Sequence, residues 1–454
     1  MMISSPRSGC GKALFGIGLT HELRRRGVSV SCCVLGPNLR QSVLYRRLSG
    51  RYVRTLDADL LSPGQNLLGA CSANVGADIV LVHGGDGLFD GPAAGGVSGS
   101  NAEMAALLHS PVLMVLDSRG SGSGLAAEFS GLSAVARDFK MMGAVINRCQ
   151  PGNPRNGREF YDQAFDAFGE ARPLGVLPEF DHGFDIPPRN PAAGSSQTLM
   201  SMQALAELAD WVADNVDIKE LLLRASQAPA LQVEDFTHEP HGRRCRIGVT
   251  DDSCFNLLFQ DNLDLLRYYG ADVVPFSPLA DVTLPKRCGA LYFTGASLAE
   301  YAPELARNEP LKEAIREFVK NGGVIYSEGA GTAYLSRKFR ISREQGTFDG
   351  VGILPGAAVT GRGNYMLREC VTIDDTILGP PGLIVKGIST GEWRLQEDDF
   401  VVKALRADEP GNTVVKEGFS PGAQILATFS YFHMGSNPDI ARHLVEAAEI
   451  VQKI

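Results

Sequence analysis

The stretch Ser5-Pro6-Arg7-Ser8-Gly9-Cys10-Gly11-Lys12-Ala13 lies between a short apolar run and an amphipathic segment at the start of the chain. Two close glycines let backbone N–H groups curl around an anion, and the lysine and the next helix add positive charge. The stretch therefore predicts a phosphate-binding loop on an α/β fold. Ala13 stands where such loops place a Ser or Thr that binds Mg²⁺. The predicted nucleotide-binding residues of the loop are Ser8, Gly9, Gly11 and Lys12.

Length and composition limit the class of protein. A chain of 454 residues is too long for one hydrophobic core and predicts two domains. Its net charge of −9 argues against nucleic acid or an anionic membrane as a partner. No apolar run approaches the ~20 residues that span a bilayer, and no secretion signal is evident, so we expect a cytoplasmic protein. Nine scattered cysteines without a C-x-x-C pair predict reduced thiols.

The first half of the chain alternates short apolar runs with helical patterns. This alternation predicts a mostly parallel sheet with helices on both faces. Functional side chains of such folds gather at the carboxyl ends of the strands. The predicted strands are 1–4, 28–35, 78–82, 112–116, 143–146 and 174–177, with helices at 12–26 and 197–225.

A polar, proline-bearing and aperiodic stretch at 226–243 predicts a linker between domains 1–225 and 244–454. The second domain repeats the α/β pattern and becomes richer in strands over 350–430. Its other predicted strands are 245–249, 272–275, 290–293 and 324–326, and its predicted helices are 262–269, 310–320, 331–338 and 438–453.

Several motifs follow one another in an order typical of one family. They are the loop, then Val82-His83-Gly84-Gly85-Asp86-Gly87-Leu88-Phe89-Asp90-Gly91, Val145-Ile146-Asn147-Arg148, Val274-Pro275-Phe276-Ser277-Pro278-Leu279-Ala280-Asp281 and Ser430-Tyr431-Phe432-His433-Met434-Gly435-Ser436-Asn437-Pro438. Together they resemble the cobyrinic acid a,c-diamide synthase family over nearly the full chain. The resemblance implies an α/β fold: a P-loop, dethiobiotin-synthetase-like parallel-sheet domain followed by a class I glutamine-amidotransferase-like domain.

The resemblance also implies a reaction. Members of the family use ATP and Mg²⁺ to phosphorylate carboxylates of a corrinoid or related tetrapyrrole, and ammonia released from glutamine displaces the phosphate. The resemblance implies substrate-binding roles for Asp90 and Arg189. Asn147 would read the nucleotide base, or it simply ends a strand.

Three departures fall where the family has oxygen atoms close to Mg²⁺. Ala13 replaces the loop hydroxyl, Asn38 replaces an acidic residue after Gly36-Pro37, and His83 replaces a glutamate. All three are poor ligands for a hard cation. The remaining candidate metal ligands are Asp86, a new carboxylate near the changed glutamate, and Asp117, which is otherwise a turn cap.

The departures in the second domain affect the nucleophile and its base. The family's Y-x-E-C-G-G elbow is Tyr326-Ser327-Glu328-Gly329-Ala330-Gly331, so Gly329 replaces the cysteine that would attack glutamine. The family's H-x-H aligns with Tyr431-Phe432-His433 and leaves one histidine. A general base needs a proton to take, so His433 is expected to be a packing residue. We therefore expect no glutaminase activity.

Two hypotheses remain from the sequence. In the first, the chain is a degenerate relative that keeps a nucleotide or tetrapyrrole binding or assembly role, with a partner protein or a second copy as a possible companion. In the second, it is an active ATP-dependent amidoligase that uses free or partner-supplied ammonia. A partition-type ATPase, suggested by Arg7, explains neither the Leu88-Phe89-Asp90-Gly91 segment nor the second domain.

Overall fold

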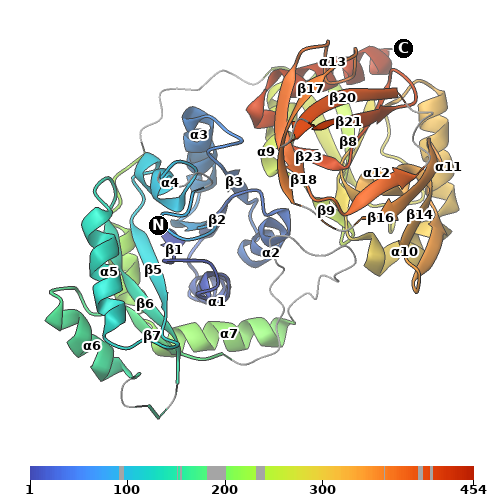
Figure 1. Cartoon of the computed structure of the whole chain (residues 1–454). Coiled ribbons are helices and arrows are strands. Elements are labelled where there is room, and N and C mark those ends of the chain that lie inside the picture. The colour runs from blue at the N-terminus through green and yellow to red at the C-terminus, as the bar shows by residue number, and fades with distance from the viewer. Residues whose placement is uncertain are drawn as a thin grey trace. The chain divides into compact units, whose positions relative to one another are not determined.

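The computed structural model describes residues 1–453 except 92–96, 151, 154–155, 181–200, 232–240, 362, 364, 397–401 and 410–412. The predicted substrate residue Arg189 therefore lies outside the described residues, as does part of the predicted linker. The chain divides into two compact units, of which the first holds the elements from β1 to α8 and the second those from β8 to α13 (Figure 1).

The first unit is built on a seven-stranded sheet in the order β3-β2-β4-β1-β5-β6-β7, in which every neighbouring pair is parallel. The sheet confirms the predicted α/β class. Its elements are β1 (Met2–Ser4), α1 (Lys12–Arg25), β2 (Val30–Leu35), α2 (Leu39–Ser49), β3 (Arg54–Leu56), α3 (Pro63–Asn74), β4 (Ile79–His83), α4 (Asn101–Leu107), β5 (Val112–Asp117), α5 (Gly124–Val135), β6 (Met141–Cys149), α6 (Arg158–Ala167), β7 (Gly175–Pro178), α7 (Met202–Asn215) and α8 (Ile218–Ala225).

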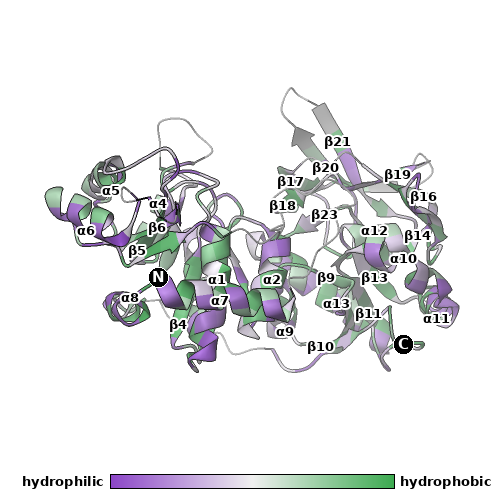
Figure 2. Cartoon of the chain, turned by 90° about the horizontal axis from the view of Figure 1, so that it is seen from below, coloured by the Kyte–Doolittle hydropathy of each residue, from purple (hydrophilic) through white to green (hydrophobic). Residues whose placement is uncertain are grey.

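Two hydrophobic layers cover the two faces of this sheet. One layer packs α1, α7 and α8 against the strands, with Phe15 and Leu208 fully buried. The other packs α3, α4, α5 and α6, with Phe129 and Phe165 buried. Figure 2 shows the consequence of this two-sided burial, because the strands of the sheet are largely apolar.

The prediction of one continuous helix over 197–225 is wrong. Among the described residues it consists of two helices, α7 and α8, separated at Val216 and Asp217. Val216 has an extended backbone, and the Asp217 carboxylate accepts a hydrogen bond from the Glu220 N–H at 3.0 Å. Asp217 is thus an N-cap that begins a new helix. The periodicity of the apolar residues spans both helices and does not reveal the break.

The second unit contains a ten-stranded sheet in the order β10-β8-β11-β13-β22-β21-β20-β17-β18-β23, parallel from β10 to β22 and antiparallel beyond. Smaller sheets pair β12 with β9 and order β15-β14-β16-β19. The elements are β8 (Cys245–Thr250), β9 (Phe255–Leu257), α9 (Gln260–Tyr268), β10 (Ala271–Phe276), β11 (Ala290–Phe293), β12 (Gly295–Ala296), α10 (Leu298–Arg307), α11 (Glu309–Lys320), β13 (Val324–Ser327), α12 (Ala330–Leu335), β14 (Ser336–Ser342), β15 (Gly346–Asp349), β16 (Leu354–Thr360), β17 (Met366–Thr372), β18 (Ile384–Ser389), β19 (Trp393–Gln396), β20 (Val402–Glu409), β21 (Thr413–Ser420), β22 (Ile425–Ala427), β23 (Ser430–Phe432), the 3₁₀ helix η2 (Met434–Ser436) and α13 (Asp439–Lys453).

The predicted helix 331–338 is too long at its end. Helix α12 stops at Leu335, because Ser336 takes an extended backbone and begins β14. The strand-rich character predicted for 350–430 is confirmed for the described residues, which form β16 to β22.

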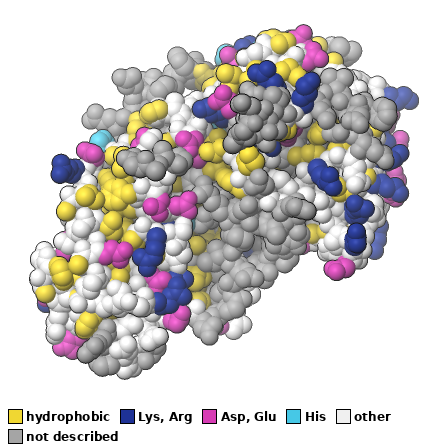
Figure 3. Space-filling model, in the orientation of Figure 1, with side chains coloured by type: hydrophobic (Ala, Val, Ile, Leu, Met, Phe, Trp, Pro, Cys, Tyr) yellow, Lys and Arg dark blue, Asp and Glu magenta, His cyan; other side chains and the backbone are white. Residues whose placement is uncertain are grey.

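The surface of the molecule mixes charges of both signs. On the face in Figure 3, Lys and Arg side chains alternate with Asp and Glu among the described residues. All nine cysteines carry free thiols. No described helix is both long and apolar enough to cross a bilayer.

We expect Leu208→Ala to lower the free energy of unfolding of the first unit by about 2–5 kcal/mol, because it opens a cavity between α7 and α1. The matched variant Leu223→Ala removes a side chain that is 58% exposed, so its cost should stay within about 0.5 kcal/mol. Urea unfolding followed through Trp211, in a Trp393→Phe background, measures both. Equal costs would contradict the packing described.

Candidate functional site

The glycine-rich loop joins the end of β1 to the start of α1 at the centre of the first sheet. Gly9 and Gly11 have φ values of 85° and 96°, a left-handed conformation that glycine adopts without strain. A Cβ atom at Gly11 would lie 2.1 Å from Nδ2 of Asn147, so this glycine also allows a close approach of β6. The loop has the backbone of an anion cradle.

Lys12 holds the base of the loop together. Its Nζ atom donates to Ser5 Oγ at 2.7 Å and to the Asp86 carbonyl oxygen at 2.9 Å. Above it, Ser8 Oγ donates to Asp86 Oδ1 at 2.7 Å. Burial lowers the pKa of Lys12, and Cys10, Asp86 and Asp90 act in the opposite direction. The structure thus brings together the predicted residues Ser8, Lys12 and Asp86.

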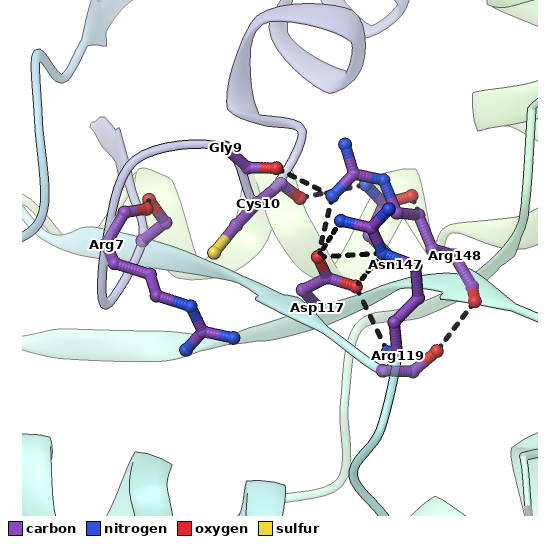
Figure 4. A network of polar contacts seen from close by, with 9 residues as sticks. Arg7, Gly9, Cys10, Asp117, Arg119, Asn147 and Arg148 are labelled. Atoms are coloured by element: carbon purple, nitrogen blue, oxygen red, sulfur yellow. Dashed lines mark hydrogen bonds and ion pairs between the residues drawn. The ribbon is translucent and has the colours of Figure 1, made fainter.

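Asp117 and two arginines form a charged cluster on the other side of the loop (Figure 4). Asp117 Oδ2 accepts from Arg119 at 2.9 Å and from Arg148 at 2.6 Å. Arg148 also donates to the Gly9 carbonyl oxygen at 2.6 Å. Hydrogen bonds from the arginines lower the pKa of Asp117 although burial raises it, so the carboxylate is ionised near neutral pH.

Asn147 and Asp90, predicted to contact nucleotide and substrate, both have structural partners. Asn147 Nδ2 donates to the Cys10 carbonyl oxygen at 2.9 Å and so ties β6 to the loop. Asp90 Oδ2 accepts from the Gly87 N–H at 3.1 Å and closes a turn after β4. Their ligand-binding roles remain predictions.

Of the three positions predicted to lack a magnesium-binding oxygen, two make other contacts in this chain. Ala13 has no polar side-chain atom. Asn38 caps α2, because its side-chain oxygen accepts from the Gln41 N–H at 3.1 Å. His83 is buried and its Nδ1 atom lies 3.0 Å from the hydroxyl of Tyr45. Burial, with Lys12 nearby, lowers the pKa of His83 to about 3, so it is a neutral ring at pH 7.

These residues do not fit a bound Mg²⁺ ion, which prefers carboxylate and hydroxyl oxygens in octahedral geometry. Within the part of the chain that the structure describes, no group of three or more His, Cys, Asp or Glu side chains is arranged to hold a metal. The metal roles of Asp86 and Asp117 remain predictions, and the recorded contacts of Asp117 are with arginines.

Two cavities open at the carboxyl edge of the sheet, past the ends of β5, β6 and β7. One, of about 540 Å³, is lined by Arg119, Arg148 and the loop that leads into α5. The other, of about 570 Å³, lies between the ends of β6 and β7, and the two share Gln150, Asn153 and Asn156. Each has the size of a small-molecule site.

In the second unit, the elbow between β13 and α12 is filled from within. Gly329 has φ 53° and ψ −129°, the kind of strained strand-to-helix turn that presents a nucleophile in other folds. A Cβ atom there would lie 2.1 Å from Oη of Tyr431. A Cβ atom at Gly295 would lie 2.2 Å from Cε1 of the same ring. Tyr431 therefore occupies the space of a nucleophilic side chain.

Glu328, the residue before the elbow, is fully buried. Its carboxylate accepts from the hydroxyls of Tyr292 and Tyr326 at 2.6 and 2.7 Å and from the Phe432 N–H at 2.9 Å. Burial raises the pKa of Glu328 to about 7, although these hydrogen bonds lower it. The carboxyl therefore holds β13 and β23 together.

His433 is buried in the second unit. Its Nδ1 atom accepts from the Gly435 N–H at 3.1 Å, and its ring lies 4.7 Å from that of Phe259. Its Nε2 atom lies 3.7 Å from Asp261 Oδ2. The packing role of His433 remains a prediction.

Two residues of these centres were not predicted from the sequence. Arg148 was visible only as part of a strand-end motif, and nothing local shows that its side chain returns to the loop. The sequence contains a signal that could have indicated the role of Tyr431. A bulky ring where the family is expected to have histidine coincides with glycine where it is expected to have cysteine. The reciprocal change in size points to a filled site.

The second unit matches a known class of protein. The family model of the CobB/CobQ-like glutamine amidotransferase domain matches residues 246–438. With a parallel α/β unit before it, the chain has the organisation of a two-part glutamine amidotransferase.

Several known proteins are similar to this chain over nearly its full length. The cobyrinate a,c-diamide synthase of Syntrophotalea carbinolica is 30% identical over 98% of this chain and 98% of its own. That of Leptospira interrogans is also 30% identical with the same coverage. The chain belongs to the cobyrinate a,c-diamide synthase family. A solved structure of cobyrinic acid a,c-diamide synthase from Mycobacterium smegmatis, with bound ADP and magnesium, is 13% identical, covers 51% of this chain and 97% of that one, and overlaps with a TM-score of 0.25.

The stability of the second unit should fall as pH rises from about 4.5 to 7. The folded state holds the Glu328 proton more tightly than the unfolded state, so the stabilisation is complete below the unfolded pKa and lost as pH passes through the folded one. The difference corresponds to roughly 3 kcal/mol. Urea unfolding followed through Trp393, in a Trp211→Phe background, measures it. Glu328→Gln should flatten this pH dependence, whereas the exposed control Glu344→Gln should keep it.

Introducing a side chain at the elbow should be costly only while Tyr431 is present. We expect Gly329→Cys to lower the free energy of unfolding by about 1–3 kcal/mol, and by clearly less in a Tyr431→Ala background. Gly352→Cys is the control, since that glycine also has positive φ but no atom within 4 Å of a Cβ. Additive costs for Gly329→Cys and Tyr431→Ala would show that the ring does not fill the elbow.

Proposed function

We propose that this chain is a catalytically impaired member of the cobyrinate a,c-diamide synthase family that binds a phosphate-bearing ligand such as ATP. In this proposal it neither hydrolyses glutamine nor transfers phosphate through a magnesium complex. Its second ligand would be a carboxylate-bearing tetrapyrrole of the cobyrinate type, because the names of the relatives refer to cobyrinate. Its role would be binding or assembly.

The observation that carries the proposal is the filled elbow. Cleavage of glutamine in this class needs a nucleophile that forms a covalent intermediate. Gly329 offers no side chain, and the ring of Tyr431 lies where one would be. The four cysteines of the second unit do not replace it, because burial raises the pKa of Cys245, Cys254, Cys288 and Cys370 and keeps them as thiols near neutral pH.

The ligand-binding part of the proposal rests on the first unit. The loop keeps its two left-handed glycines, its buried lysine and a neighbouring cavity of about 540 Å³. A phosphate group suits this arrangement, because backbone N–H groups at the start of α1 and the charge of Lys12 favour an anion. The missing metal ligands argue against catalysis and leave phosphate binding intact.

ATP or ADP should raise the melting temperature of the purified chain. A ligand at a hundred times its Kd stabilises the folded state by about 2.7 kcal/mol, which is a shift of several degrees. Lys12→Ala should abolish the shift, and the exposed control Lys219→Ala should keep it. A chain that shows no shift at millimolar nucleotide would refute nucleotide binding.

Two assays decide the catalytic part. Incubation with glutamine should release no glutamate, and incubation with cobyrinic acid, ATP and free ammonia should form no amide. Amide formation from free ammonia would overturn the proposal in favour of an active amidoligase. Glutamate release would overturn the assignment of Gly329.

A further inference from the structure

We propose that the loop of the first unit binds its phosphate ligand without a divalent cation, and that Arg148 supplies the positive charge that a metal supplies elsewhere. The inference rests on the proposed nucleotide binding and goes beyond it, because it names the charge balance of the site and the residue responsible.

The side chains predicted to lie close to a metal are committed to other contacts. The amide oxygen of Asn38 is committed to the start of α2, and the ring of His83 is neutral and packs against Tyr45. Ala13 contributes no oxygen. A ligand that carried Mg²⁺ into the loop would meet an apolar methyl group and a ring held in place by Tyr45, neither of which completes its coordination.

Arg148 lies directly against the glycine-rich loop. Its guanidinium group lies against the loop, between the Gly9 carbonyl oxygen and Asp117 Oδ2, with both contacts at 2.6 Å (Figure 4). Its backbone has φ 59°, a conformation that costs a non-glycine residue about 1 kcal/mol or more. The surrounding contacts hold the residue in this conformation, and it directs the side chain to the loop.

The cluster of Asp117, Arg119 and Arg148 carries a net positive charge. Asp117 is a single carboxylate shared by Arg119 and Arg148, so the three side chains carry one net positive charge. A guanidinium group binds phosphate through two parallel hydrogen bonds, which are stronger than its bond to a neutral carbonyl. Arg148 can therefore exchange the Gly9 carbonyl for a phosphate oxygen and keep Asp117.

The 540 Å³ cavity has a polar lining that suits the same ligand. Its lining includes Arg119 and Arg148 together with the hydroxyl-bearing residues Ser118, Ser121 and Ser123. Because Arg148 also contacts the Gly9 carbonyl oxygen, its guanidinium group links the loop to this cavity. All of these groups belong to the first unit and to its described residues.

The test is the affinity for ADP, measured by titration calorimetry in millimolar Mg²⁺ and again in EDTA. We expect the two dissociation constants to agree within about twofold, because no group of three or more His, Cys, Asp or Glu side chains among the described residues is arranged to hold a metal. Arg148→Gln should weaken binding about tenfold or more in both buffers, the loss expected for a charge-assisted hydrogen bond. Arg148→Lys should lie between, because it keeps the charge and loses the fork.

Controls separate this inference from misfolding and from the proposed function. Arg172→Gln, at an exposed arginine of the same unit, should leave the affinity unchanged. Asp117→Asn should tighten ADP binding several-fold, because it removes a negative charge beside the guanidinium group that binds the phosphate, and a misfolded variant would not gain affinity. A requirement for Mg²⁺ would overturn the inference and leave the proposed function standing. Unchanged affinity in Arg148→Gln would exclude the role of Arg148. Absence of ADP binding in both buffers would overturn both proposals.

Discussion

The hydrogen bonds of Lys12 to Ser5 and to the Asp86 carbonyl are the interaction on which the first unit's site depends. They join the exit of β1, the start of α1 and the segment after β4, which are far apart in the sequence. A buried ammonium group is tolerated only because these oxygens satisfy it. The glycine-rich loop is therefore tied to the segment after β4 by hydrogen bonds within the protein.

The two centres of the molecule share one physical feature. At each, side chains of the protein itself take up the space and the hydrogen-bonding capacity around the predicted functional positions. Asn38 caps a helix, His83 bonds to Tyr45, and Tyr431 fills the elbow around Gly329. These contacts maintain packing density and satisfy buried polar groups, so both centres contribute to the stability of the fold.

The sequence predicted the architecture well where it depends on local pattern. Strands β2, β5 and β11 lie close to the predicted ranges, and the elbow and the loop are where their glycines indicate. The break between α7 and α8 was missed, because apolar periodicity continues across Asp217. Arg148 and the neutral state of His83 were also missed, because both arise from contacts with residues distant in sequence. The roles of Asp90, Asn147 and Arg189 depend on a ligand that no pattern can place.

The pairing of Gly329 with Tyr431 couples the two positions in their tolerance of substitution. A side chain at position 329 meets the tyrosine ring, and loss of the ring at 431 alone leaves a void, so the residues that each position accepts depend on the residue at the other. The two positions should therefore behave as an epistatic pair, and a search for new side chains at the elbow has to vary both together.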